Sequence, residues 1–205
     1  MTGACATGID AAAGTTTLSE TADTKVDRNL VFGCTNTDGT TPDSSWYRVF
    51  SLAAAGIDTP FHVDHVTIGI CFAVAGPGAG SGSAAIPQVD VKIGTYSGGA
   101  MDQTLDVSKI TALKMTTVEI PATQITELVE APIAVDVPGG KNLVVEVHVA
   151  DRNGTGEQVD IGSTANTQSQ PAYLRSPLCS LNQPTSTTAA GHADAHFIIT
   201  VTGTH

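Results

Sequence analysis

The feature that most constrains the fold is a run of alternating residues at positions 142–150. Its apolar members recur at every second position: Leu143, Val145, Val147 and Val149. Between them stand Val144, Glu146 and His148. Because successive side chains of a β-strand point to opposite faces, this run predicts a central strand with one apolar and one mixed face. Residues typical of turns flank this run. Pro-Gly-Gly at 138–140 precedes it, and a polar stretch that contains glycine follows it at 151–156.

Other short segments have the same character and are separated by Gly- and Pro-containing turns. The strongest are 46–52, 61–75, 89–96, 115–120, 133–137 and 197–201. Segment 61–75 changes phase along its length, which indicates a β-bulge, and segment 105–113 could hold one helical turn. About nine to eleven short strands without a long helix predict an all-β protein, an antiparallel β-sandwich of jelly-roll type.

Residues 1–28 differ from the remainder of the chain because they are rich in Ala, Thr and Gly and show little periodicity. We predict an extended N-terminal arm over 1–28, with a short strand near 15–18, and a single β-sandwich domain over 29–205. An ordered arm needs something to hold it, either Cys5 or a neighbouring subunit. A homo-oligomer formed through residues 1–28 is therefore one expectation.

Charge and hydropathy exclude several classes of partner. The chain has 9 Lys and Arg against 20 Asp and Glu, a net charge of −11. Such a balance argues against binding to nucleic acid or to an anionic membrane surface. No apolar run approaches the roughly 20 residues of a membrane-spanning helix. A polar composition of Thr, Ser and Gly with little Lys is typical of secreted bacterial proteins.

The four cysteines form no C-x-x-C pair, so zinc-ribbon and thioredoxin sites are not indicated. Cys34 and Cys179 both lie among polar and turn residues. A disulfide between them would join the two ends of the domain and stabilise it by roughly 4 kcal/mol. Cys71 lies in an apolar strand. It is either a buried free thiol or the partner of Cys5 in a second disulfide.

Several segments together resemble β-sandwich modules appended to secreted bacterial proteins, some of them proteases. The matching segments are 46–52, 61–70, 137–147, 161–163, 170–179 with 184–185, and 196–203. The resemblance covers roughly residues 30 to 203 and marks a fold rather than a reaction. It implies a non-catalytic, extracellular accessory domain in which Cys34 and Cys179 are regular features.

Two His/Asp clusters could ligate a metal ion. On a strand, His192, Asp194 and His196 would face one side, about 7 Å between successive members, and these ligand types suit zinc or copper. The alternative is a polar strand edge. His62 and Asp64, with His65 beside them, form the second cluster. A shared four-ligand site would require the clusters to meet; we expect each to be a surface strand face.

A third candidate metal site is the loop that contains Asp151 and Asn153. It offers several oxygen atoms to a structural calcium ion. Its spacing departs from that of an EF-hand loop. The Asn-Gly pair within it favours a hairpin turn instead.

The aromatic candidates for ligand binding are Trp46, Tyr47, Tyr96 and Tyr173. Trp46 and Tyr47 belong to segment 46–52, where concentrated aromatic residues usually anchor a core. If the four side chains were exposed, they could stack on the faces of sugar rings.

Three functions follow from these observations. The first is a non-catalytic extracellular module for binding or scaffolding, with a polysaccharide or a cell-surface component as partner. The second is a self-assembling structural subunit of an extracellular fibre or shell, in which the N-terminal arm is donated as a strand. The third, a hydrolase, lacks a Gly-x-Ser-x-Gly motif, and no particular carboxylate pair is selected.

Overall fold

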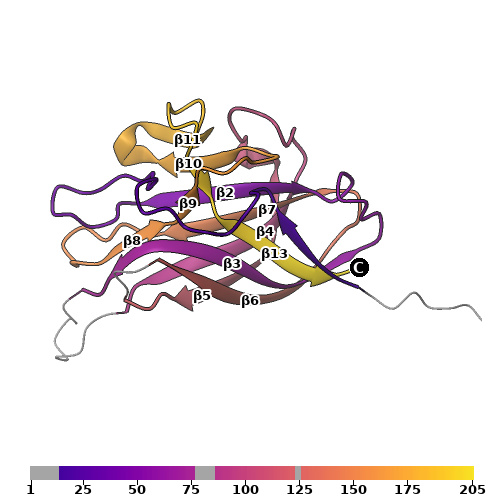
Figure 1. The fold of residues 1–205 in the computed structure, drawn as a ribbon, viewed down its shortest axis with the longest axis horizontal. Coiled ribbons are helices and arrows are strands. Elements are labelled where there is room, and N and C mark those ends of the chain that lie inside the picture. Colours follow the sequence, from indigo (N-terminus) through magenta and orange to yellow (C-terminus); the bar gives the residue numbers. More distant parts are fainter. Residues whose placement is uncertain (1–13, 77–85, 123–125) are drawn as a thin grey trace, which may run out of the picture.

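The computed structural model describes residues 14–76, 86–122 and 126–205. These residues form thirteen β-strands and two short 3-10 helices, and the strands pair in antiparallel sheets that pack against each other (Figure 1). The predicted all-β antiparallel sandwich is confirmed. The strands outnumber the predicted nine to eleven because the structure adds two-residue strands, which alternation cannot reveal.

The first sheet has five strands and contains both ends of the described chain. Its order is β1 (Thr15–Ser19), β13 (Ile199–Thr204), β3 (Phe61–Val74) and β6 (Glu127–Val137), with β8 (Gln158–Ile161) pairing with β3 as well. The pairing of β3 with β6 shifts in register between Val63 and His65. That shift is the bulge predicted from the phase change.

The second sheet has six strands. Its order is β11 (Leu181–Ser186), β10 (Ala172–Ser176), β2 (Ser44–Ser51), β7 (Asn142–Val149), β4 (Gln88–Tyr96) and β5 (Ile110–Glu119). A small third sheet pairs β9 (Ser163–Thr164) with β12 (His196–Phe197). The 3-10 helices are η1 (Val107–Lys109), at the position of the predicted helical turn, and η2 (Pro177–Cys179).

Strand β7 is the predicted central strand and lies between β2 and β4. Its four alternating apolar residues are fully buried between the sheets. On the opposite face, Val144 joins a second apolar cluster with Tyr47, Tyr96 and Tyr173. Glu146 and His148 share this outer face and are partly exposed. The mixed face of the run therefore divides into an apolar part and a charged part.

The apolar segment 29–32 is irregular. Phe32 is buried there, and its carbonyl oxygen accepts a hydrogen bond from Trp46 Nε1 at 3.3 Å. The burial of Phe32 explains the apolar signal of this segment without a strand.

The described part of the N-terminal arm, residues 14–28, lies against its own sandwich. Strand β1 pairs with β13, residue Thr21 forms a bridge with Gln168, and Asp27 forms one with Ser163. The short strand expected near 15–18 is therefore present. Residues 1–13, including Cys5, lie outside the described residues.

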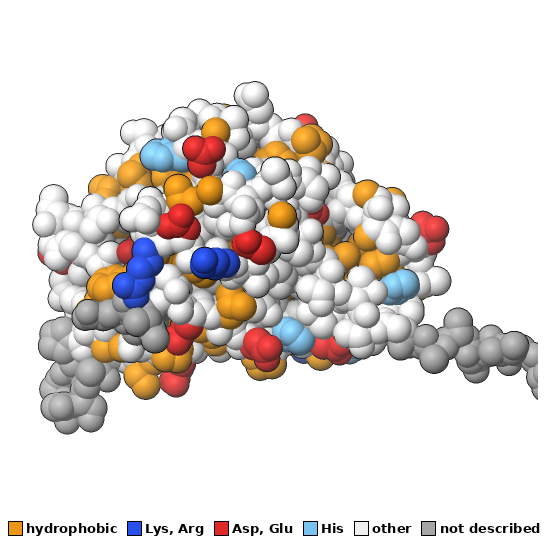
Figure 2. All heavy atoms as spheres, viewed as in Figure 1, with side chains coloured by type: hydrophobic (Ala, Val, Ile, Leu, Met, Phe, Trp, Pro, Cys, Tyr) orange, Lys and Arg blue, Asp and Glu red, His pale blue; other side chains and the backbone are white. Residues whose placement is uncertain are grey.

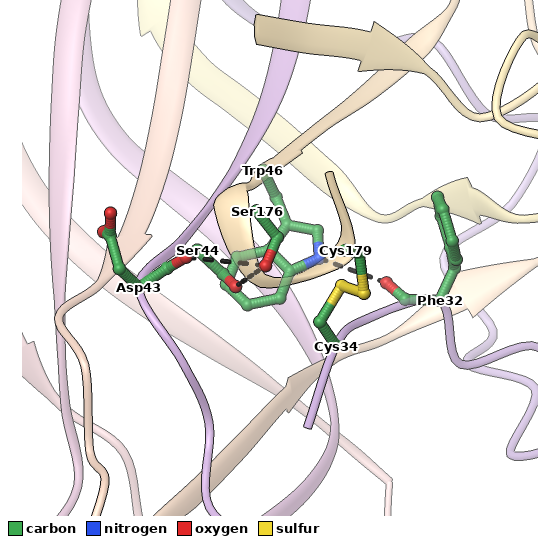
Figure 3. Close-up of a disulfide and its surroundings, with 7 residues drawn as sticks. All are labelled: Phe32, Cys34, Asp43, Ser44, Trp46, Ser176 and Cys179. Atoms are coloured by element: carbon green, nitrogen blue, oxygen red, sulfur yellow. Dashed lines mark hydrogen bonds between the residues drawn. A yellow bond between two sulfur atoms is a disulfide. The ribbon is translucent and has the colours of Figure 1, made fainter. Parts of the chain in front are cut away.

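A disulfide joins Cys34 to Cys179, with the Cα atoms 6.1 Å apart, as predicted (Figure 3). Beside it, the Ser44 hydroxyl donates to the Ser176 hydroxyl at 3.0 Å (Figure 3). The disulfide joins η2 to the irregular segment around Cys34, and the hydroxyl pair joins the end of β10 to the start of β2. Cys71 is a buried free thiol, and Cys5, the partner considered for it, lies outside the described residues.

Candidate functional site

The four aromatic candidates are not available to a ligand. The exposed fractions are 1% for Trp46, 3% for Tyr47 and Tyr96, and 0% for Tyr173. Tyr173 also donates its hydroxyl to the Asp102 carbonyl at 2.7 Å, because the segment around residue 102 covers this part of the second sheet. Sugar stacking depends on exposure, so these four buried side chains do not form an exposed platform for a sugar ring.

The first His/Asp cluster is not a ligand set. Residues 192–195 form a turn, in which Ala195 N donates to the His192 carbonyl, so the predicted strand alternation does not hold. The His192 ring stacks on Phe32, with centroids 3.9 Å apart. Both ring nitrogens of His196 face backbone carbonyls, those of Asn166 and Ala193. In the part of the chain that the structure describes, His192, Asp194 and His196 are therefore not brought together as a group of metal ligands.

The second cluster lies on the exposed face of β3 and β6. His62 Nδ1 is 2.6 Å from Asp136 Oδ1, and its Nε2 is 3.9 Å from Asp64 Oδ1. All three side chains are well exposed, as expected for a surface strand face. Within the described ranges, no three His, Cys, Asp or Glu residues are grouped to hold a metal ion.

The loop at Asp151 and Asn153 uses its oxygen atoms for its own turn. Asp151 Oδ1 accepts hydrogen bonds from Asn153 N and from Asn36 Nδ2. Gly154 has a φ of 77°, and its amide donates to Asp38 Oδ2 at 2.7 Å. This geometry is that of the alternative, an Asn-Gly turn, and it gives no support to a calcium site.

A row of charged side chains that was not predicted from the sequence crosses the outer face of the second sheet. His148 Nε2 lies 3.0 Å from Asp43 Oδ1, and its Nδ1 lies 3.7 Å from Asp90 Oδ2. Arg175 pairs with the other Asp43 oxygen at 3.1 Å. Burial would raise the pKa of the Asp43 carboxyl, but hydrogen bonds from His148 and Arg175 hold it below its ordinary value.

A second pair extends this row. Lys92 Nζ lies 3.2 Å from Glu146 Oε1, which also accepts a hydrogen bond from the Ser45 hydroxyl. The mixed face of the 142–150 run was the only sign of this row in the sequence. The residues that pair with Glu146 and His148 lie far away in the sequence. The row contains both signs, and its carboxylates face Lys92, Arg175 or the imidazole of His148.

The sheet edges differ in how they are protected from pairing with another chain. Strand β5 carries Lys114 and a register shift against β4, and β6 contains Pro132. Strand β11 contains Pro184, whose carbonyl accepts from Leu105 N. The Thr41 hydroxyl bonds both the amide and the carbonyl of Val159 in β8. Lysine, proline, bulges and covering segments are the usual devices that block edge pairing.

Strand β1 has none of these devices. It contains neither proline nor charge, and its pairing with β13 is continuous from Thr15 to Ser19. Beyond the strand, residues 20–22 pair with 167–169, but along 15–19 the described chain adds no further strand. Of the terminal strands of the two main sheets, as far as the structure describes them, β1 alone has an unprotected edge.

A groove of about 360 Å³ runs beside β1. Residues 16–19 of β1 line it together with residues 50–51 and 54–55 of the end of β2 and the turn that follows. Glu20 and Ser169 also line it, and the Ser169 hydroxyl donates to the Glu20 carboxylate. Burial raises the pKa of Glu20, although Ser169 and the Arg48 charge oppose the shift. The β1 groove, defined by residues 16–20, 50–51, 54–55 and 169–170, therefore has short side chains at Ala54 and Ala55 and one acidic group.

Charged side chains are scattered over the face seen in Figure 2, where the few Lys and Arg residues stand among Asp and Glu. No helix in the described ranges is long and apolar enough to cross a membrane. Comparisons with protein-family models and with curated proteins find no match for this chain.

Proposed function

We propose that this chain is a non-catalytic extracellular β-sandwich module that binds or scaffolds by accepting an extended strand at the edge of β1. The observation that carries the proposal is the combination of an unprotected edge and an adjoining groove. An added strand would hydrogen-bond to the free backbone groups of Thr15–Ser19 and place alternate side chains in the groove. Main-chain bonds would supply affinity, and the groove would select side chains.

The groove favours a particular kind of partner strand. Its walls at Ala54 and Ala55 are short side chains on an exposed turn, so small residues of a partner would approach closely. Glu20 would pair with a basic or hydroxyl-bearing side chain at one end. The partner is therefore an extended protein segment with small residues and few acidic ones.

An extracellular setting accords with two observations. The Cys34–Cys179 disulfide is of the kind that persists in oxidising compartments. The resemblance to modules of secreted bacterial proteins implies the same location. The scaffolding role takes precedence over carbohydrate binding because the aromatic side chains that would have stacked on sugars are buried.

The donated-strand alternative concerns residues 1–28. Thr15–Ser19 already pair with β13 of the same chain, so the donated part would be residues 1–13, outside the described residues. A fibre or shell built this way stays a prediction, and it would use the same β1 groove as the acceptor.

Filling the groove should weaken strand binding. We expect ten-residue peptides selected by phage display on the full chain to lose at least tenfold in affinity for Ala55→Arg, since the longer side chain occupies the space beside β1. The measurement is fluorescence polarisation with labelled copies of the selected peptides.

Ala53→Arg is the matched control, because Ala53 is an exposed residue of the same turn that does not line the groove. It should bind the peptides as the unmodified chain does. Selected peptides that bind Ala55→Arg at full affinity would show that the binding surface lies elsewhere, and the proposal would fail.

A further inference from the structure

We infer that a second copy of this chain is a partner for the β1 edge, with the two β1 strands pairing antiparallel about a two-fold axis. This inference rests on the proposed function and names one occupant of the same site. It joins the five-stranded sheets of the two copies into one continuous sheet.

The geometry of β1 permits such a pair. With Thr17 opposite Thr17 on the axis, residues 15–19 of one copy face residues 19–15 of the other. Each pair then joins two odd-numbered or two even-numbered residues. Residues whose N–H and C=O groups point away from β13 therefore face residues of the same kind in the other copy. The contacting residues include three consecutive threonines, which are β-branched and suited to a pleated sheet. The interface is isologous, the commonest form of oligomer contact.

The distribution of charged residues favours self-association at the β1 edge over other surfaces. Each chain carries a net charge of −11, so most faces of two copies repel each other. Residues 11–19, in contrast, contain no charged side chain. In the two-fold pair, the Glu20 residues would stand at opposite ends, about 20 Å apart at 3.4 Å per residue. That separation exceeds the Debye length of about 8 Å at physiological salt, which leaves their repulsion weak.

The other edges fit a second copy less well. Antiparallel pairing of β5 strands would bring together strands that each contain Lys114 and a register shift, and pairing of β6 strands would meet Pro132 on both sides. One five-residue strand pair buries little surface, so the dimer should be reversible and dependent on protein concentration.

Sedimentation equilibrium over a wide range of protein concentration tests the inference. The full chain should form a reversible dimer, and Thr17→Lys should weaken it at least tenfold by placing two ammonium groups together on the axis. Thr17 is exposed, so the substitution leaves the core intact. Thr17→Lys also lowers the net negative charge, so it would strengthen any non-specific association between acidic chains.

Two variants serve as controls. Thr17→Val removes the hydroxyl contact with Thr202, 3.0 Å away, without adding charge, and should keep the dimer. Thr111→Lys makes the same change at an exposed position of β5 and should also keep it. A monomer at every concentration would overturn the inference, as would a dimer indifferent to Thr17→Lys or lost equally in Thr111→Lys. A monomer whose groove still binds the selected peptides would leave the proposed function standing.

Discussion

Replacing both Cys34 and Cys179 by serine is expected to lower the free energy of unfolding by about 4 to 5 kcal/mol. The disulfide closes a loop across a sequence separation of 145 residues. In the chain-entropy model, releasing a loop of this length restores that much conformational freedom to the unfolded chain. Urea denaturation of the oxidised chain and of the double-serine variant measures the difference.

The matched control is Cys71→Ala, since Cys71 is a buried cysteine outside any bridge. It should cost no more than about 1 kcal/mol, because it removes one sulfur atom from the interior. A double-serine variant that unfolds at the same urea concentration as Cys71→Ala would contradict a structural role for the disulfide.

Arg48→Met is expected to destabilise the chain by about 3 to 5 kcal/mol, because it leaves two buried carbonyl groups without a donor at a cost of about 1–3 kcal/mol each. Arg48 has an exposed fraction of 0%. Its Nε and Nη2 both donate to the Phe197 carbonyl, and Nη1 donates to the Gln170 carbonyl. Methionine fills similar volume but leaves these carbonyls without a donor. Burial lowers the pKa of Arg48 to about 9, so the guanidinium remains charged at neutral pH.

Arg175→Met is the control, because it makes the same change at a partly exposed ion pair with Asp43. Exposed pairs contribute less than about 1 kcal/mol. Thermal and urea unfolding of both variants give the comparison. An Arg48→Met variant as stable as Arg175→Met would show that the guanidinium does not join β2 to β12.

The central strand and the sandwich were predictable because both rest on local periodicity. Val145 and Val147 stand two residues apart, and period two follows directly from the pleat of a strand. The bulge in β3 was predictable for the same reason, since a change of phase in the apolar pattern is visible in the sequence itself.

Properties that depend on distant segments were not predictable. Whether Tyr173 is exposed depends on the segment around Asp102, which covers it. His192 and His196 were expected to share a strand face, but the turn at 192–195 and the Asn166 carbonyl determine where they lie. The charged row around His148 combines residues from β4, β7 and β10 with Asp43, and no local pattern shows these neighbours.

The β1 groove was predictable from the sequence only in part. The uncharged, proline-free stretch of Thr15–Ser19 is visible in the sequence, and it marks a strand without edge protection. Its place at the end of a sheet depends on pairing with β13, near the other end of the chain. The wall at Ala54 and Ala55 has no signal that associates it with β1.

Amide hydrogen exchange of the terminal strands tests the central claim most directly, measured on dilute chain with and without a saturating groove-selected peptide. Strand addition at β1 predicts slower exchange within Thr15–Ser19 when the peptide is bound. Exchange in β5, β6 and β11 should not change. Protection that arises in one of those three strands, with β1 unchanged, would contradict the account.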